Sequence, residues 1–379
     1  MTTSTPISYS LASSFEIDEG IDTAEWIKLE RSKGAIDRSG KALIPWWTDL
    51  KIELSDELWQ HCKTVENWRS CHALPLNVFN ATLRDRAQKV DPNVMIAQRL
   101  KRFSSIMNKL VREPSMKLSQ MQDLGGCRAV LPDIAAVYRL YEMYREGDQL
   151  PPTEVAVKCH DYIKQPKTDG YRGIHVIGRY HARSKEREHW NGQRIEVQLR
   201  TRLQHAFATA VETVTTFTGE RLKFGAGPDE WRRFFSLAGS AFSLREGTEL
   251  VEKTPKDVSE LISELRDASK KLRVHERLTG WSDALRALPR KNIKQGFTWL
   301  LLVLNIKEKK TMVTGFQNRK EASKELAKIE KARDLDLDAV LVWVPSVSTL
   351  RAAYPNYYAD TRKFLEALTM ALAKKVTSS

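Results

Sequence analysis

The chain has little cysteine and no long apolar run. Its four cysteines contain no C-x-x-C pair, so neither a disulfide framework nor a usual zinc spacing follows. The longest apolar stretch, FTWLLLVLNI, is shorter than the roughly 20 residues that a membrane span needs. The first residues lack a basic start and an apolar signal core, which argues against secretion. We therefore expect a cytoplasmic protein that does not associate with membranes.

Potential metal ligands gather in one N-terminal stretch. They are His61, Cys62, Cys71 and His72. These side chains could in principle chelate a metal, but we expect them to be packing residues on helices in a reducing compartment.

Positive charge is what the chain has in excess. Its 379 residues carry a formal charge of +13, with 41% hydrophobic and 29% charged residues, which is typical of a globular protein with room for two domains. A basic surface attracts polyphosphates and nucleic acid. Because an ATP pocket also needs Lys and Arg, charge alone leaves nucleic acid, nucleotide and simple solubility open.

Two strand-like runs within residues 158–201 carry unusual polar residues. Side chains alternate between the faces of a strand, so Ile195, Val197 and Leu199 share a buried face of RIEVQLRT. The opposite face then carries Glu196, Gln198 and Arg200. A carboxylate, an amide and a guanidinium in register favour a polar site, although an ordinary solvated face is the alternative.

Helical patterns cover residues 23–33, 55–71 and 76–90, and a basic amphipathic helix is expected over 94–112. On that helix Lys101, Ser105 and Lys109 recur every four residues and form a ridge, which could also be a plain solvated face.

The next motif, QDLGGCR, should begin a strand. A carboxylate beside a glycine pair suits magnesium close to phosphate, although ordinary turns use the same residues.

Four motifs together resemble a known family. RLKRFSSIMNKL, QDLGGCR, HDYIKQPKTDGYRGIH and IEVQLRT occur in the order and spacing of the RelA/SpoT nucleotidyltransferase domain, over roughly residues 95–215. The resemblance implies an α+β fold with a mixed, nucleotidyltransferase-like sheet and helical flanks. It also implies a pyrophosphokinase, which moves the β,γ-pyrophosphate of ATP onto a ribose 3′-hydroxyl and releases AMP.

The resemblance also assigns roles to residues. Asp123 and Glu196 would be catalytic and would bind Mg²⁺. ATP would be bound by Arg99, Lys101, Ser105, Lys109 and Arg128, with the two arginines on either side of the adenine. The acceptor would be bound by Lys167, Tyr171, His175 and Gln198. His205, on a mostly apolar helix, is expected to be a packed residue without a role in the chemistry.

One departure from the family pattern bears on the acceptor. Ordinary alarmone synthetases carry an R-x-K-D type motif that holds the phosphates of GDP or GTP, whereas this chain has Lys158-Cys159-His160-Asp161. Histidine is mostly neutral near pH 7, so its hold on phosphate is weaker. This favours the 3′-CCA end of tRNA as acceptor, as in toxic members of the family. The alternatives are a (p)ppGpp or (p)ppApp synthetase and a non-catalytic basic RNA-binding module. No H-x-x-H-D hydrolase signature is present.

The flanks WRSCHALPLN and YPNYYADTRKF resemble the CapRel type, a fused toxin–antitoxin of phage defence. The expected organisation is a helical flank over 1–90, the pyrophosphokinase core over 91–220, a helical connector over 221–292 and a small C-terminal α/β domain, pseudo-zinc-finger-like, over 293–379. The resemblance implies autoinhibition through Tyr354 and Tyr357, and release by a phage protein such as a capsid protein. The alternative is that these tyrosines only cover the core of their own domain.

Overall fold

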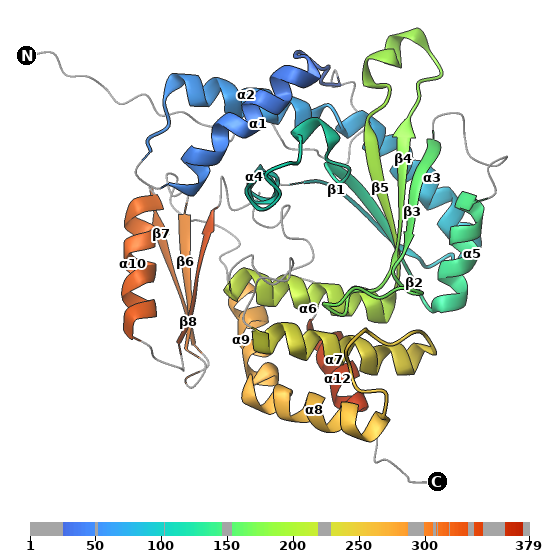
Figure 1. Cartoon of the computed structure of the whole chain (residues 1–379), viewed down its shortest axis with the longest axis vertical. Coiled ribbons are helices and arrows are strands. Elements are labelled where there is room, and N and C mark those ends of the chain that lie inside the picture. The colour runs from blue at the N-terminus through green and yellow to red at the C-terminus, as the bar shows by residue number, and fades with distance from the viewer. Residues whose placement is uncertain are drawn as a thin grey trace, which may run out of the picture. The chain divides into compact units, whose positions relative to one another are not determined.

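In the computed structural model (Figure 1), the described residues are 26–49, 52–101, 103–145, 154–218, 229–286, 299–305, 308, 310–317, 319–332, 337–343 and 361–373. The chain divides into two compact units. One comprises Trp26–His275 together with Asp360–Ser379, and the other comprises Met1–Glu25 together with Glu276–Ala359. None of the helices in the described ranges is long and apolar enough to cross a membrane.

The larger unit is built on a five-stranded sheet of order β1-β2-β5-β4-β3. The strands are β1 (Met95–Leu100), β2 (Gly125–Leu131), β3 (Glu154–Asp161), β4 (Ile174–Tyr180) and β5 (Arg194–Thr201). Strands β2 and β5 run parallel, and the other neighbouring pairs are antiparallel. The predicted α+β architecture with a mixed sheet is confirmed.

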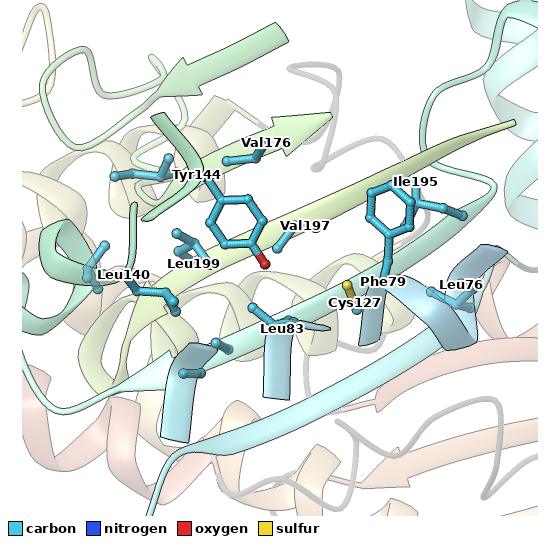
Figure 2. Close-up of a cluster of buried hydrophobic side chains, with 14 of the residues drawn as sticks. Leu76, Phe79, Leu83, Cys127, Leu140, Tyr144, Val176, Ile195, Val197 and Leu199 are labelled. Atoms are coloured by element: carbon cyan, nitrogen blue, oxygen red, sulfur yellow. The ribbon is translucent and has the colours of Figure 1, made fainter. Parts of the chain in front are cut away.

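One face of this sheet is covered by α3 (Ala73–Val90) and α5 (Ile134–Arg145). Phe79 and Leu83 of α3 and Leu140 of α5 pack here against Val197 and Leu199 of β5, as Figure 2 shows. These side chains are at most 2% exposed. Because side chains alternate along a strand, the residues between them lie on the other face, which is left for the polar groups.

A second apolar cluster joins the helices that flank the sheet. It contains residues of α1 (Lys33–Thr48), α2 (Asp56–Ser70), α4 (Phe103–Arg112) and the 3-10 helix η1 (Leu118–Gln120). The side chain of Ser55 accepts a hydrogen bond from the backbone N–H of Leu58 at 3.2 Å, and it caps α2 as its place in the sequence predicts.

The four potential metal ligands lie in and beside α2 and are used in packing. Burial raises the pKa of the Cys62 thiol to about 12, and burial and Glu30 do the same for Cys71. His72 is buried, with its Nδ1 2.8 Å from the carbonyl oxygen of Trp68. The Nδ1 of His61 contacts the hydroxyl of Ser39 at 3.0 Å.

Two predicted helices are wrong in their extent. Residues 94–112 do not form one helix, because 95–100 pair with β2 as the edge strand β1 and the helix α4 begins only at Phe103. The helix expected over 23–33 instead starts at Lys33, where the Ser32 side chain accepts from the N–H of Ala35 at 3.3 Å. Residues 26–32 are not helical.

Further helices complete the larger unit: α6 (Arg202–Thr218), α7 (Asp229–Glu246), α8 (Val258–Lys271) and α12 (Thr361–Ala373). The ring of Phe364 in α12 lies 5.5–6.3 Å from the rings of Phe207 in α6 and of Phe234, Phe235 and Phe242 in α7. The sequence-based division assigned α7 and α8 to a connector and α12 to the C-terminal domain. The structure groups all three with the sheet.

The smaller unit contains a three-stranded antiparallel sheet of order β7-β6-β8. Its strands are β6 (Trp299–Asn305), β7 (Lys310–Phe316) and β8 (Leu337–Trp343), and α10 (Arg319–Ala332) packs on them. The helix α9 (Val274–Arg286) spans the boundary between the two units. Tyr354 and Tyr357 lie outside the described residues, so the expectation for them stays a prediction.

Candidate active site

Polar side chains form two adjacent rows across the face of the five-stranded sheet that lies opposite α3 and α5. In one row, Arg128 of β2 is level with Gln198, His175 and His160 of the next three strands. In the neighbouring row, Gly126 separates Arg99 of β1 from Glu196 of β5. The strand register therefore brings together residues that are up to 99 positions apart in the sequence, from 99 to 198.

Asp123 lies just before β2 and is held between two lysines. The Nζ of Lys101 donates to its Oδ2 at 2.6 Å, and the Nζ of Lys109 donates to its Oδ1 at 3.1 Å. Burial by itself would raise the pKa of Asp123, but the two ammonium groups outweigh burial and hold it well below its ordinary value. Asp123 is therefore a carboxylate at neutral pH, close to two cations.

Five side chains, with Glu196 among them, form a closed ring of hydrogen bonds. The hydroxyl of Tyr171 lies 2.5 Å from His175 Nε2, and His175 Nδ1 lies 2.9 Å from Glu196 Oε1. Gln198 Nε2 donates to Glu196 Oε2 at 2.6 Å. Arg200 closes the ring, because its Nη2 donates to Gln198 Oε1 at 2.6 Å and its Nε donates to the Tyr171 hydroxyl at 3.1 Å.

The donors and acceptors of this ring match throughout. Both oxygens of Glu196 accept, one from the Nδ1–H of His175 and the other from the amide of Gln198. Burial would raise the pKa of Glu196 and so would Asp123, but His175 and Gln198 lower it to about 2. A carboxylate with so low a pKa is a weak base and a good ligand for a cation, because proton acceptance is most effective when the pKa lies near the working pH.

Arg99 and Arg128 lie on the same face of the neighbouring strands β1 and β2. Burial, Arg200 and Arg99 together lower the pKa of Arg128 to about 10, although Glu212 of α6 opposes this change. Arg99 Nη1 lies 3.7 Å from Glu212 Oε1. This end of the sheet has an excess of positive charge, which favours an anionic ligand. The sequence interpretation missed Glu212, because its helical pattern only indicates packing.

Aromatic rings and a lysine lie at the opposite end of the row. Lys167 Nζ is 4.4 Å from the ring centroid of Tyr162 and 5.2 Å from that of Tyr171, and Arg200 Cζ is 5.1 Å from the latter. The imidazole of His160 stacks on Tyr162 at 5.5 Å, with 4° between the ring planes. Tyr162 was not among the predicted site residues, although its place directly after His160-Asp161 in the acceptor motif is a signal for it.

The remaining predicted residues also lie in or beside this region. Ser105 is half-buried on α4, one turn before Lys109. His205 of α6 is 8% exposed, and burial, Arg128 and Arg200 lower its pKa to about 3. It is therefore a neutral, packed residue next to the arginines.

Asp123 and Glu196 fit a magnesium ion that arrives with a nucleotide. They are two ionised carboxylates, close enough for Asp123 to act against the lowered pKa of Glu196. Over the described ranges, no group of three or more His, Cys, Asp or Glu side chains could hold a metal by itself. Mg²⁺ on nucleotides is held in this way, by one or two carboxylates together with phosphate oxygens and water.

Residues 98–218 match the protein family described as "Region found in RelA / SpoT proteins". All the predicted site residues except Tyr354 and Tyr357 fall within this range. This part of the chain is therefore similar to the region shared by RelA and SpoT proteins.

Among curated proteins, the chain is 31% identical over 145 residues to the GTP pyrophosphokinase YwaC of Bacillus subtilis (strain 168), covering 34% of this chain and 65% of that protein. It is 25% identical over 183 residues to the uncharacterized protein Rv1366 of Mycobacterium tuberculosis (strain ATCC 25618 / H37Rv), covering 48% of this chain and 55% of that protein. The match thus spans less than two thirds of the length of these relatives. Among solved structures, small alarmone synthetase 1 from Bacillus subtilis bound to its product pppGpp aligns with 19% identity and a TM-score of 0.39, covering 48% of this chain and 94% of that one.

Proposed function

We propose that the chain is a magnesium-dependent pyrophosphokinase that uses ATP as donor and a ribose 3′-hydroxyl as acceptor. The 3′-oxygen forms a bond to the β-phosphorus, the bond from that phosphorus to the α,β-bridging oxygen breaks, AMP leaves with the electron pair, and the proton of the 3′-hydroxyl passes to water. The observation that carries this proposal is the pair of ionised carboxylates, Asp123 between two lysines and Glu196 within its ring, on one polar sheet face.

The residues divide the work by charge. Lys101 and Lys109, which neutralise Asp123 in the structure, would bind the triphosphate of ATP, and Asp123 and Glu196 would hold Mg²⁺. The ion supplies charge neutralisation on the transferring phosphates. Phosphoryl-type transfers go through a loose transition state and depend mainly on positioning and charge stabilisation. A Glu196 with a pKa of about 2 suits that role better than the role of general base.

The acceptor that we propose is the 3′-CCA end of tRNA, so that the reaction blocks translation. Burial, Lys158 and His175 lower the pKa of His160, and this imidazole is neutral at pH 7. A neutral ring stacked on Tyr162 favours a flat base over a 5′-polyphosphate. The net charge of +13 also favours a nucleic acid.

The second candidate is a synthetase of (p)ppGpp or (p)ppApp type. Two observations favour it: the similarity to a protein described as a GTP pyrophosphokinase, and the cations Lys158 and Lys167 on the acceptor side. Both candidates use the same ATP site and differ only in the acceptor.

We further propose that the C-terminal part of the chain restrains the enzyme through Tyr354 and Tyr357. A tyrosine ring is flat enough to take the place of adenine between Arg99 and Arg128, which lie on one face of neighbouring strands. A phage protein, such as a capsid protein, that binds the C-terminal part would release the enzyme.

The acceptor is tested with the full chain and with the variant Tyr354→Ala with Tyr357→Ala, which should be active without a trigger. Each is incubated with γ-labelled ATP and, separately, GDP, GTP, AMP and bulk tRNA. We expect label on tRNA, and we expect His160→Arg to gain transfer to GDP or GTP, because a permanent cation then faces the 5′-phosphates. Added salt should reduce transfer to tRNA far more than transfer to a free nucleotide. Label on GDP or GTP from the wild-type sequence, with none on tRNA that has an intact CCA end, would favour the second candidate.

A further inference from the structure

Glu246, the last residue of α7, joins two segments of the candidate active site. Its Oε2 accepts from Arg172 Nη1 at 2.6 Å and from Gln204 Nε2 at 3.2 Å. Its Oε1 accepts from the hydroxyl of Thr201. A single carboxylate, 45 residues beyond the end of β5, thus holds the loop before β4 and the junction of β5 and α6 together.

Two of the three residues that Glu246 holds directly follow members of the hydrogen-bonded ring in the sequence. Arg172 directly follows Tyr171, and Thr201 directly follows Arg200. Tyr171 and Arg200 are neighbours in the ring and bond to each other, and both lie on the acceptor side. The position of Glu246 therefore fixes the backbone from which this side of the site is built.

The same helix packs tightly on the acceptor loop at a pair of glycines. Gly170 has φ of +85°, and a Cβ at this position would lie 2.3 Å from the carbonyl oxygen of Phe235 in α7. A Cβ on Gly239 of α7 would lie 2.6 Å from the Cα of Gly170. With no side chain between the two backbones, a displacement of α7 must displace the loop.

Arg172 depends strongly on Glu246. Its side chain is 1% exposed, and within the described part of the chain its Nε and Nη2 have no hydrogen-bond partner. A buried guanidinium needs a compensating charge, and removal of one member of a buried ion pair leaves the other uncompensated. The loop would then rearrange to bring Arg172 toward water.

We propose that Glu246 is a positioning residue for the acceptor side of the active site, an inference that rests on the proposed function. It acts through Arg172 and Thr201, which fix Tyr171 and Arg200. It makes no contact with the lysines that hold Asp123, so its influence falls on the acceptor and not on ATP.

The test compares two variants of the full chain, both combined with Tyr354→Ala and Tyr357→Ala, which should remove the C-terminal restraint. Glu246→Gln keeps the size of the side chain and removes the charge that compensates Arg172. Glu264→Gln is the matched control, because Glu264 of α8 pairs with Arg233 of α7 through two contacts of 2.6 Å, and both side chains are exposed. Thr201→Val and Thr201→Ser form a second pair, in which only the first loses the hydroxyl that bonds to Glu246.

Two readouts separate positioning from stability. With tRNA that has an intact CCA end, Glu246→Gln should lower kcat/KM for tRNA by about 10- to 100-fold, as expected for misplaced reactants, while KM for ATP changes less than about twofold. Glu264→Gln should change neither value. Thr201→Val should follow Glu246→Gln in direction, and Thr201→Ser should retain activity.

Hydrogen exchange of the peptide 164–175 tests the same inference without any turnover. Glu246→Gln should speed exchange there, and Glu264→Gln should not. The inference is overturned if both variants speed it equally, or if Glu246→Gln raises KM for ATP as much as KM for tRNA. If the wild-type chain labels no acceptor, the proposed function fails, while the exchange measurement still decides whether Glu246 positions the loop.

Discussion

At the scale of single residues, different partners stabilise the ionised forms of Asp123 and Glu196. Two lysines stabilise Asp123, whereas Glu196 is stabilised by a histidine and an amide inside a closed ring. In the proposed reaction, the lysines on Asp123 would bind phosphates and Asp123 would bind Mg²⁺. The ring around Glu196 holds that carboxylate in place before substrate binds, which is the preorganisation that charge stabilisation requires.

Neutralising either carboxylate should abolish activity and leave the fold intact. For Asp123→Asn and Glu196→Gln we expect the labelling rate to fall by about 10²–10⁴, because stabilisation made mainly in the transition state is lost. Circular dichroism should match the wild type, and toxicity in cells should disappear. Growth inhibition at the wild-type level by either folded variant would rule out the proposed site.

The lowered pKa of Glu196 predicts a dependence of stability on pH. The pKa of Glu196 is about 2 in the folded chain against 4.5 for an ordinary Glu. Its contribution to the free energy of unfolding is therefore complete above pH 4.5 and is lost as the pH falls toward 2. At 1.36 kcal/mol per unit, the contribution is about 3 kcal/mol at neutral pH.

Glu196→Gln should therefore flatten the fall in the free energy of unfolding between pH 4.5 and 2, and Glu186→Gln, at an exposed position, should leave that slope unchanged. The measurement is urea unfolding at several pH values. Equal slopes for the wild type and Glu196→Gln would show that the carboxylate is not stabilised in the folded state.

The sequence predicts most of the site because alternation within a strand is a local property. The pattern of residues 194–201 alone places Glu196, Gln198 and Arg200 on one face, as the register confirms. It cannot show that Arg200 reaches Tyr171, since that contact depends on how two strands pair. The role of Glu246 is harder still to predict from the sequence, because nothing at the end of an amphipathic helix indicates which distant arginine its carboxylate contacts.

At the scale of elements, the stretch 94–112 shows where local patterns fail. Its apolar residues recur at helical spacing, yet residues 95–100 are a strand because β2 offers an edge to pair with. Tertiary pairing overrides a weak local preference in short segments. Lys101 and Lys109 still meet at Asp123, but from the end of a strand and from a helix, not from one ridge.

The C-terminal helix α12 should contribute strongly to the stability of the unit that holds the sheet. Phe364 is fully buried among four phenylalanine rings, so Phe364→Ala should lower the free energy of unfolding by about 3–5 kcal/mol. Glu366→Ala, at an exposed position of the same helix, should change it by less than about 0.5 kcal/mol. Urea unfolding followed by tryptophan fluorescence measures both. A loss below about 1 kcal/mol for Phe364→Ala would mean that α12 is not packed there in solution.

At the scale of the whole molecule, the greater part of the smaller unit is inserted in the sequence between helices of the larger one. Residues 276–359 follow α8, and α12 comes directly after them. The inserted part is therefore connected to the larger unit at both of its ends. Such a connection makes it possible for a ligand of the inserted part to affect the catalytic unit, provided that the ligand favours one of two states.

Removing the two tyrosine rings should release the enzyme without a trigger. Moving a two-state equilibrium from 1:99 to 99:1 takes about 5.5 kcal/mol, and each stacked ring would supply a part of it. Tyr354→Ala with Tyr357→Ala should raise ATP affinity and tRNA labelling, whereas the Phe pair, which keeps the rings, should stay restrained. Circular dichroism and trigger binding check that the domain remains folded. A folded Ala pair that stays inactive until triggered would assign the tyrosines to another role.

The most direct test of the account counts both products of one reaction. The released chain is incubated with γ-labelled ATP and tRNA that ends either in a normal adenosine or in 3′-deoxyadenosine, and AMP and labelled tRNA are measured together. Transfer of pyrophosphate to the 3′-hydroxyl predicts one AMP for each label on normal tRNA, and neither product with the deoxy terminus or with Asp123→Asn. Label on the deoxy-terminated tRNA, or AMP released without label on tRNA, would contradict it.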